Sequence, residues 1–547
     1  MVKKTRTKTD GEDSGRFLAM LGKICLAVFA GVLVVAGVTV ITWVKRSEDR
    51  HIVEFSEVGG FYDSDVRIKL STTGMMIPGV MEIKYSLDGG DVSGGAGVSY
   101  NDESAIVLEA PERGYKVYTV KAGFCYVGKS CKNVRTETYV LGKSLETDVD
   151  MTIVSISSDP YNLYDYEYGI MVPGKIFDEA IAAGEEPIGN YSVRTDDWIR
   201  DAHVTIFDSD GATIMNDDVG IQMSGGTSAT LEIKSFKLVG NEKHGYRGVK
   251  YDFGDGVQTY NSLKLRSGQD QAAGNIRASV ASRLAKESGF DGVFDSEHVI
   301  VFLNNEYYGI MDLQQNYSDS FLAKKFGLAN SNGVVKHKPS EDVVFEAAGI
   351  SELFENDLNV KENRELLEQY VDMDNYLLYF ALQIMWNNTD WPMNNFEMWK
   401  YLGNNPDNKY EDGRYRFLIY DLDLIYYTEG NIKFFEGALS DQFEVLMGER
   451  DMEKGNGTTF GKVMESDYYA EKFVGIMRRL INGPFATENV LKIVNEEADK
   501  MRLQMVLHST VYGYNDWNNA IEIMKRAVME RNEAVRKDMI KYFGVEI

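Results

Sequence analysis

Hydrophobic and polar positions divide the chain into three zones with different periodicities. An apolar run covers residues 24–44, and short alternating segments then extend from about residue 56 to about 145. From about residue 150 to the end, strand-like and helix-like patterns are mixed, and helical spacing dominates from Tyr468 onward. Alternation with a period of two indicates strands, whereas apolar residues three or four positions apart indicate helices. We therefore predict an α+β chain with more than one domain.

The first zone is long enough to cross a membrane. Residues 24–44 contain no charged side chain, and a helix of that length spans about 30 Å, the thickness of a bilayer core. Basic residues are denser in the tail of residues 1–23 than after the run, which ends near Trp43. We predict a single-pass anchor in the cell membrane, with a cytoplasmic tail and extracytoplasmic domains. A cleaved signal peptide is the alternative, although such peptides have shorter apolar regions.

The second zone, residues 56–145, is predicted to be a small β-sandwich. Residues 83–90 indicate a strand that ends in a tight turn, and residues 118–122 and 136–140 indicate later strands. These segments resemble the small β domain at the C-terminus of chitobiase and β-hexosaminidase. The resemblance implies a spacer or a module that contacts a cell-surface glycan or protein. An immunoglobulin-like spacer is the alternative.

Two of the three cysteines belong to this zone. Cys125 and Cys131 flank a short turn-like segment, whereas Cys25 lies in the apolar run. The spacing fits a small disulfide loop in an oxidising compartment, with two free thiols as the alternative. Zinc is not expected, because no other Cys or His lies near the pair in the sequence.

The third zone, residues 150–547, is predicted to be one domain that starts with strands and ends with helices. The expected elements are a strand into a Gly-rich turn (219–226), a strand (232–239), a helix containing Ile276, Val280 and Leu284 with Asn275 as its N-cap, a hairpin (298–313), a helix from near Asp374 with Leu377, Phe380, Ala381 and Ile384 on its buried face, a strand (415–420) and a long final helix (516–543).

Composition narrows the range of functions. The formal net charge is −26, and an acidic surface repels nucleic-acid backbones, so a nucleic-acid partner is not expected. A nucleotide can still bind in a local basic pocket or through metal ions. The hydrophobic content of 44% indicates folded domains rather than disorder.

The stretch after the helix near Asp374 carries candidate catalytic chemistry. Asp390 and Asn395 are separated by four residues, which is the spacing of the protein-kinase catalytic loop, and Pro392 prevents the helix from continuing through them. In such a loop the Asp faces the acceptor hydroxyl and the Asn ligates Mg²⁺. The usual His-Arg of that loop is absent, and a polar turn is the alternative interpretation of the spacing.

A second acidic pair follows the next strand. Residues 416–420 are mostly apolar and lead directly into Asp421 and Asp423. A carboxylate at the end of a buried strand needs a partner, so both are candidate metal ligands. A turn-forming or calcium-type pair is the alternative, but the order of Asp390, Asn395 and Asp421 favours a kinase.

Several further motifs follow one another along the chain. They are Gly225-Gly226 followed by Lys234-Ser235-Phe236, Leu265-Arg-Ser-Gly-Gln-Asp270 followed by Arg277, the hairpin turn Asn304–Gly309, Asp372-Met-Asp374, Asn388-Thr-Asp390 with Asn395, and Tyr420-Asp-Leu-Asp423. In this order they resemble the CotH (spore-coat protein H) kinase family, and the stretch Ser157–Asp165 is similar to that family's opening strand. The resemblance covers nearly 400 residues.

The resemblance implies an atypical protein-kinase-like domain that binds ATP with Mg²⁺ or Mn²⁺ between a β-rich and a helical lobe. It implies that Asp390 is the catalytic residue, that Lys234, Arg266 and Arg277 contact the nucleotide, and that Asn395, Asp421 and Asp423 serve the metal. An exposed strand lysine is the alternative for Lys234, and ion pairs within the fold are the alternative for both arginines.

The chain departs from the family pattern at three positions. Ala278 replaces an acidic residue, Gln315 replaces a Glu, and Tyr420 replaces a Trp. A Gln keeps hydrogen bonds but loses the negative charge. Asp390, Asn395 and Asp421 remain in place.

We therefore expect an extracytoplasmic protein kinase that transfers phosphate from ATP to a protein Ser or Thr. A kinase-fold surface protein without turnover, acting as a binding module, is the alternative. Glycan hydrolysis is a third reading, but no pair of catalytic carboxylates is identifiable from the sequence.

Overall fold

The computed structural model describes residues 51–547 apart from 75, 93–96, 269–275, 339, 393, 427–441, 448–457 and 515. The chain forms two compact units. Among the described residues, the first contains 51–59, Asp65–Glu109 and Val120–Glu137, and the second contains Gly60–Ser64, Ala110–Thr119 and Thr138–Ile547. Strands and helices are mixed, which confirms the predicted α+β class.

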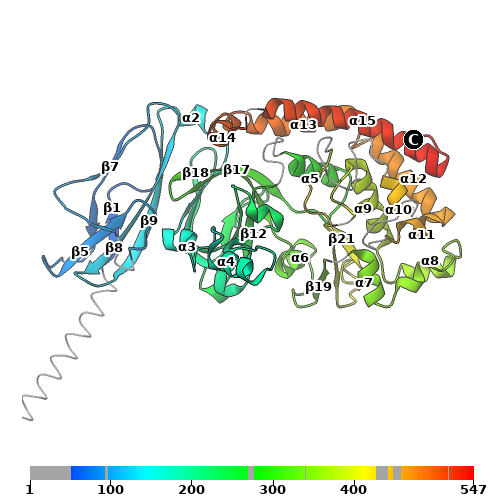
Figure 1. Ribbon diagram of the computed structural model, residues 1–547, viewed down its shortest axis with the longest axis horizontal. Helices are drawn as coiled ribbons and strands as arrows, with labels where there is room; N and C mark the ends of the chain where they lie inside the picture. Colours follow the sequence, from blue (N-terminus) through cyan, green and yellow to red (C-terminus); the bar gives the residue numbers. More distant parts are fainter. Residues whose placement is uncertain are drawn as a thin grey trace, which may run out of the picture. The chain divides into compact units, whose positions relative to one another are not determined.

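Short strands occupy the second sequence zone, as predicted (Figure 1). They are β1 (Val53–Phe55), β2 (Gly60–Tyr62), β3 (Val66–Ile68), β4 (Leu70–Thr72), β5 (Met81–Ser86), β6 (Val98–Ser99), β7 (Ile106–Leu108), β8 (Lys116–Tyr126) and β9 (Cys131–Leu141). The last two are longer than expected. Cys125 and Cys131 form a disulfide where β8 gives way to β9, which confirms the predicted pairing. The β-sandwich assignment and the domain boundaries stay predictions.

A closed seven-stranded barrel forms the β-rich part of the second unit, in the order β10-β11-β12-β13-β16-β18-β17. Its strands are β10 (Ile153–Ser157), β11 (Arg200–Phe207), β12 (Thr213–Ser224), β13 (Ser235–Val239), β16 (Ser262–Arg266), β17 (Ser296–Leu303) and β18 (Glu306–Gln315). Alternate residues fill the interior, for example Phe236, Leu238, Leu263 and Leu265. Their neighbours therefore face outward, and this alternation decides which polar side chains reach the site.

Two small sheets accompany the barrel. Strands β14 (Val249–Tyr251) and β15 (Gln258–Tyr260) pair with each other, and β19 (Val334–His337), β20 (Glu397–Tyr401) and β21 (Arg416–Leu418) form a three-stranded sheet. Strand β20 is central in that sheet and follows directly after the predicted catalytic loop. The sheet thus holds both candidate acidic segments at the ends of hydrogen-bonded strands.

Helices form the rest of the second unit (Figure 1). They are α2 (Leu145–Asp148), α3 (Pro160–Tyr164), α4 (Gly174–Ala183), α5 (Arg277–Glu287), α6 (Asp319–Lys325), α7 (Glu341–Ala347), α8 (Lys361–Leu367), α9 (Met373–Trp386), α10 (Gln442–Leu446), α11 (Phe460–Met464), α12 (Asp467–Ile481), α13 (Thr487–Met501), α14 (Gln504–Tyr512) and α15 (Trp517–Phe543), with short 3₁₀ turns at Asn190–Ser192, Asp196–Trp198, Thr227–Thr230, Glu242–His244 and Ser351–Leu353.

Helix α9 is the central helix of this part. Leu377, Phe380, Ala381 and Ile384 are fully buried, as predicted, but most of the other side chains from Tyr376 to Trp386 are buried as well. A helix that is apolar on most of its circumference belongs inside the core rather than at its surface. The prediction of a single buried face was therefore too narrow.

Three further expectations are corrected or lie outside the described residues. The stretch Ser157–Asp165 is not a strand: β10 ends at Ser157, and Pro160 begins α3. The N-cap of α5 is Ile276 rather than Asn275. The predicted anchor, residues 24–44, lies outside the described residues, and none of the helices in the described part has the length and apolar character needed to cross a bilayer.

Candidate active site

A cavity of about 1220 Å³ lies within the second unit, between the outer face of the barrel and the loop that follows α9. Barrel strands β13, β16 and β18 supply one wall, and the segments around β19, β20 and β21 supply the other. The charged and amide residues lining it are Lys237, Lys264, Arg266, Gln314, Gln315, Asn316, Asp319, Lys336, Lys338, Asp390, Asn394, Asn395, Glu397 and Asp421. Four predicted site residues, Arg266, Asp390, Asn395 and Asp421, therefore meet in one cavity.

Asp390 is held by the amides of its own loop. Helix α9 ends at Trp386, and its C-cap Asn387, with a positive φ of 51°, turns the chain away from the helix axis. Asn395 donates from Nδ2 to Oδ2 of Asp390 at 2.7 Å, and Asn394 donates to Oδ1 at 2.9 Å. The Asn395 amide is thereby oriented, and its carbonyl oxygen is the end that remains for a cation.

A second contact ties this loop to the segment carrying Asp421. Thr389 donates from its backbone N–H and from its hydroxyl to the carbonyl of Leu424, at 3.3 and 3.2 Å. Asp421 itself has a φ of 60°, a conformation that is uncommon for a residue with a side chain. Strained backbone is often found at functional sites, and here it occurs at Asn395 (φ 65°) as well.

Arg266 joins Asp421 to Asp423. Its Nη2 donates to Asp421 Oδ1 and, at 2.6 Å, to Asp423 Oδ1. Burial raises the pKa of Asp421 to about 6; Arg266 opposes this rise, whereas the charges of Asp423 and Asp390 add to it. Arg266 is therefore engaged by carboxylates within the fold, which was the alternative expected for it.

Lysines on both walls give the cavity positive charge. Lys237 on β13 lies directly opposite Lys264 on β16, and Lys336 and Lys338 approach from β19 and the residues after it. Burial lowers the pKa of Lys264 to about 8, with Lys338, Arg266 and Lys237 adding to this effect and Glu397 opposing it. Like charges directly opposite on neighbouring strands are destabilising unless an anion lies between them.

The predicted nucleotide contacts Lys234 and Arg277 are placed elsewhere. Lys234 donates from Nζ to the carbonyls of Ala229 and Leu231 at 2.8 and 2.7 Å, and it is not among the residues that line the cavity in the described part of the chain. Side chains alternate along the chain, so Lys234 lies on the same side as Phe236, whose side chain enters the barrel. Lys237 lies on the opposite, outward side. Arg277 is buried at the first residue of α5 and likewise does not line the cavity.

The Gly-rich turn lies at the rim of the cavity. Ser224, Gly225, Gly226 and Ser228 line it just after β12 ends. Gly225 has a φ of +92°, and a Cβ there would lie 2.4 Å from the Ser228 hydroxyl. Only glycine fits this turn, so the backbone can approach a ligand closely. Residues 269–275, which include Asp270 of the next motif, lie outside the described residues.

The departures at Ala278 and Gln315 have different surroundings. Gln315 lines the cavity, and its Oε1 accepts a hydrogen bond from the Asp295 backbone N–H at 2.9 Å. Ala278 is partly buried against the large core of the helical part. The neutral amide at position 315 therefore lies in the cavity, whereas Ala278 packs against apolar side chains.

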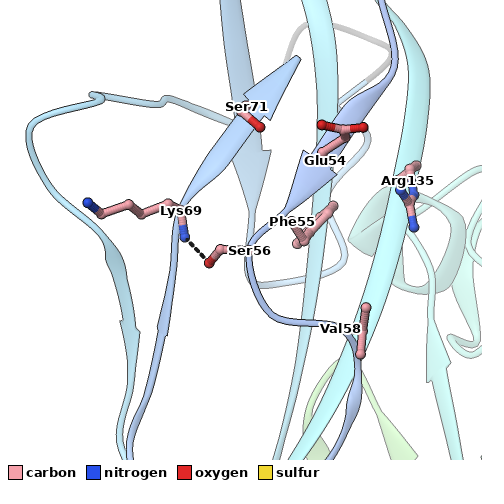
Figure 2. Close-up of a pocket in the computed structure, with 7 residues that line it drawn as sticks. All are labelled: Glu54, Phe55, Ser56, Val58, Lys69, Ser71 and Arg135. Carbon is pink, nitrogen blue, oxygen red and sulfur yellow. Dashed lines mark hydrogen bonds between the residues drawn. The ribbon is translucent and has the colours of Figure 1, made fainter. Parts of the chain in front are cut away.

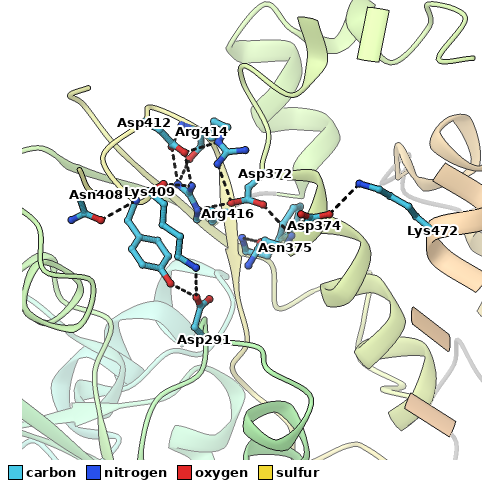
Figure 3. Close-up of polar contacts among 12 residues, drawn as sticks. Asp291, Asp372, Asp374, Asn375, Asn408, Lys409, Asp412, Arg414, Arg416 and Lys472 are labelled. Carbon is cyan, nitrogen blue, oxygen red and sulfur yellow. Dashed lines mark hydrogen bonds and ion pairs between the residues drawn. The ribbon is translucent and has the colours of Figure 1, made fainter. Parts of the chain in front are cut away.

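An ionic cluster around the buried Arg416 links the start of helix α9 to the start of strand β21 (Figure 3). Asp372 caps α9 by accepting from the Asn375 N–H at 3.2 Å, and it accepts from Arg416 Nε at 2.9 Å. Arg416 also binds Asp412 through both terminal nitrogens, at 3.0 and 2.7 Å. The family motif in the sequence includes Asp372 but gives it no role. Its contacts show that it caps helix α9 and binds Arg416.

The donor set of the cavity suits a hard divalent cation. Asp421 presents a partly exposed carboxylate, and the Asn395 carbonyl oxygen is a second hard donor, which are ligands typical of Mg²⁺. Burial is the main cause of the raised pKa of Asp421, and the nearby charge of Asp423 adds to it. Within the described ranges, however, no three Asp, Glu, His or Cys side chains form a ready metal cage.

A smaller hollow of about 420 Å³ lies in the first unit (Figure 2). Figure 2 shows Arg135 and Glu54 at its edge, with Lys69 opposite. Arg135 is already paired with Glu137 at 3.0 Å, and Lys69 and Glu54 are exposed. The hollow therefore lacks the buried polar groups of a built ligand site.

The family comparison covers the part of the chain that builds the cavity. A family model described as CotH kinase protein matches residues 221–535, from the Gly-rich turn into the final helix. No curated protein matches the chain. Because the matched segment is more than half of the 547 residues, the chain belongs to the CotH kinase family.

Proposed function

We propose that the chain is a protein kinase that transfers the γ-phosphoryl group of ATP to a Ser or Thr hydroxyl of another protein. The observation that carries the proposal is that the barrel wall of the cavity bears Lys237 and Lys264, whereas the opposite wall bears Asp390, Asn395 and Asp421 together with Lys336 and Lys338. Phosphoryl transfer depends on positioning and on compensation of phosphate charge, and the two walls would supply these separately.

Each wall has a distinct task in this proposal. Asp390, with both oxygens aligned by amides, would accept the proton of the acceptor hydroxyl. Asn395 and Asp421 would hold Mg²⁺ or Mn²⁺, which compensates the charge of the phosphates. Lys237 and Lys264 would take the phosphate-pairing role that the sequence pattern assigned to Lys234, while the Gly225 turn would cover the phosphates.

The wider arrangement is part of the same proposal. The barrel and the helical part would correspond to the two lobes of a kinase-like domain. Residues 24–44 would anchor the chain in the cell membrane with the cavity outside, and the first unit would contact a cell-surface glycan or protein. No nucleic acid is expected as a partner, because the net charge is −26.

The direct test uses the full-length chain purified in detergent, with radiolabelled ATP, Mg²⁺ or Mn²⁺ and a mixture of extracellular proteins. Label should appear on Ser or Thr, and it should be lost in Asp390→Asn and Asp421→Asn. Asp374→Asn is the matched control, because Asp374 is exposed on α9 and pairs with Lys472 outside the cavity. Equal labelling in all four proteins would contradict the proposal.

A nucleotide-binding surface protein without turnover is the second candidate. Two observations favour it: Gln315 places a neutral amide in the cavity, and Arg266 already forms ion pairs with both Asp421 and Asp423. Nucleotide binding without label transfer in the same assay would select this function.

A further inference from the structure

Arg266 lies between the carboxylates of Asp421 and Asp423, a position where a metal cation could otherwise bind. One nitrogen, Nη2, bonds to both Asp421 and Asp423. The Arg266 side chain is 17% exposed and that of Asp423 is 2% exposed, whereas Asp421 retains 36%. Arg266 and Asp423 thus form the closed end of this cluster, and Asp421 forms the end that is open to the cavity.

The surroundings of Arg266 hold it in this position. It lies on β16 opposite the buried Asp312 of β18, which in turn lies 2.6 Å from His298 Nδ1. Burial opposes the charge of Arg266, but Asp423 and Asp421 outweigh it and raise the pKa of the guanidinium. Withdrawal of Arg266 would remove a cation bonded directly to the buried Asp423, which is unfavourable.

We propose that Arg266 takes the place of one cation in the Asp421–Asp423 cluster, so that the chain binds one divalent ion and not two. The inference rests on the proposed function for the presence of any divalent ion. The single ion would lie on the exposed side of Asp421, with the Asn395 carbonyl oxygen as a second ligand. Asp423, predicted from the sequence as a metal residue, would serve the site only by fixing Arg266.

The charges around the cavity agree with a single ion. Lys237, Lys264, Arg266, Lys336 and Lys338 give five positive side chains, and Asp319, Asp390, Glu397 and Asp421 give four negative ones, among the described residues. The lining is thus already balanced by fixed cations. A second divalent ion would add charge next to an arginine that cannot lose its own.

The stoichiometry of bound Mn²⁺ tests the inference. Free Mn²⁺ is measured by electron paramagnetic resonance during titration of the full chain in detergent, with and without the non-hydrolysable ATP analogue AMP-PNP. Wild type and Arg266→Lys should bind one Mn²⁺, and Arg266→Ala should bind two. The matched control is Lys234→Met, which removes a cation outside the cavity and should leave the count at one.

The alternative outcomes separate this inference from the proposed function. Two ions in wild type, no ion in wild type, or one ion in both wild type and Arg266→Ala overturns the role of Arg266. If Arg266→Ala does not fold, the wild-type and Arg266→Lys counts decide. If wild type binds one Mn²⁺ and Arg266→Ala binds two, but neither binds AMP-PNP, the result would support the inference and overturn the kinase proposal.

Discussion

Arg416 donates from Nε to Oδ2 of Asp372 at 2.9 Å, and this ion pair joins the start of strand β21 to the N-cap of helix α9 (Figure 3). The far ends of the same two elements lead to Asp421 and Asp390. The Arg416–Asp372 ion pair therefore links helix α9 to strand β21 at the ends away from the cavity. This link helps to set the position of Asp390 relative to Asp421. Asn375 strengthens the joint by accepting from the Phe417 N–H at 2.7 Å.

Replacing Arg416 with Met should destabilise the protein by about 2–3 kcal/mol, because the buried guanidinium loses its charge-assisted hydrogen bonds to Asp372 and Asp412. Chemical denaturation of the full chain in detergent measures this loss. Arg414→Met is the matched control: Arg414 contacts the same two carboxylates but its side chain is 30% exposed, so the loss should stay near 1 kcal/mol or below. Equal losses would show that the buried pair has no special role.

Lys234 is the nucleotide contact predicted from the sequence, whereas Lys237 is the lysine of the same segment that lines the cavity. Substituting each in turn compares their contributions to nucleotide binding. Lys237→Met should weaken binding of a fluorescent ATP analogue about tenfold, since a charge-assisted contact is lost. Lys234→Met should change it less than about twofold, because the Lys234 ammonium is bonded to backbone carbonyls away from the cavity. The reverse order of effects would restore the sequence-based assignment.

Nucleotide affinity should depend on pH through Lys264. Its pKa of about 8 means that the side chain is charged below pH 8 and becomes neutral above it, so attraction to phosphate declines as the pH rises. The groups facing it are Lys237 on β13, Arg266 on β16, Lys338 after β19 and Glu397 on β20. Affinity for the ATP analogue should fall about tenfold between pH 7.5 and pH 9.5. Lys264→Arg should remove this fall, and an unchanged profile in that variant would assign it to another group.

The acidic half of the site was predictable from local sequence. Asp390 follows a strongly apolar helix that was not expected to continue through Pro392, and Asp421 follows an apolar strand, so both were expected just after the end of an element. That Asp390 and Asp421 share one site was implied by the resemblance to the CotH kinase family and not by either segment alone. The hairpin and the final helix were likewise predicted from local sequence.

The cationic half depended on the barrel, which no single segment reveals. Seven strands close into a barrel only through pairings such as β10 with β17, which are far apart in the sequence. Without knowledge of the interior face, Lys234 and Lys237 appear equivalent. The available signal was the alternation of Phe236 and Leu238, which places Ser235 and Lys237 together on the opposite face.

Glu341 is a buried carboxyl group away from the cavity. It is fully buried at the first residue of α7, and its Oε1 accepts from the Thr459 N–H at 3.1 Å. Thr459 in turn shares a hydrogen bond of 2.9 Å with the Tyr376 hydroxyl, so the carboxyl group lies against the start of α9. Burial raises the pKa of Glu341 to about 8.

This raised pKa predicts a stability that declines as the solution becomes more alkaline. Between about pH 4.5 and pH 8 the unfolded chain has released the Glu341 proton while the folded chain keeps it, so the free energy of unfolding falls as the pH rises across this window. Glu341→Gln keeps the acceptor for Thr459 without the ionisation, and it should raise stability by about 3 kcal/mol at pH 8.5 but change little near pH 4.5. Denaturation at both pH values measures the difference, with Glu346→Gln, an exposed position on the same helix, as the control. A gain of equal size at both pH values would instead point to packing, because only ionisation depends on the proton concentration.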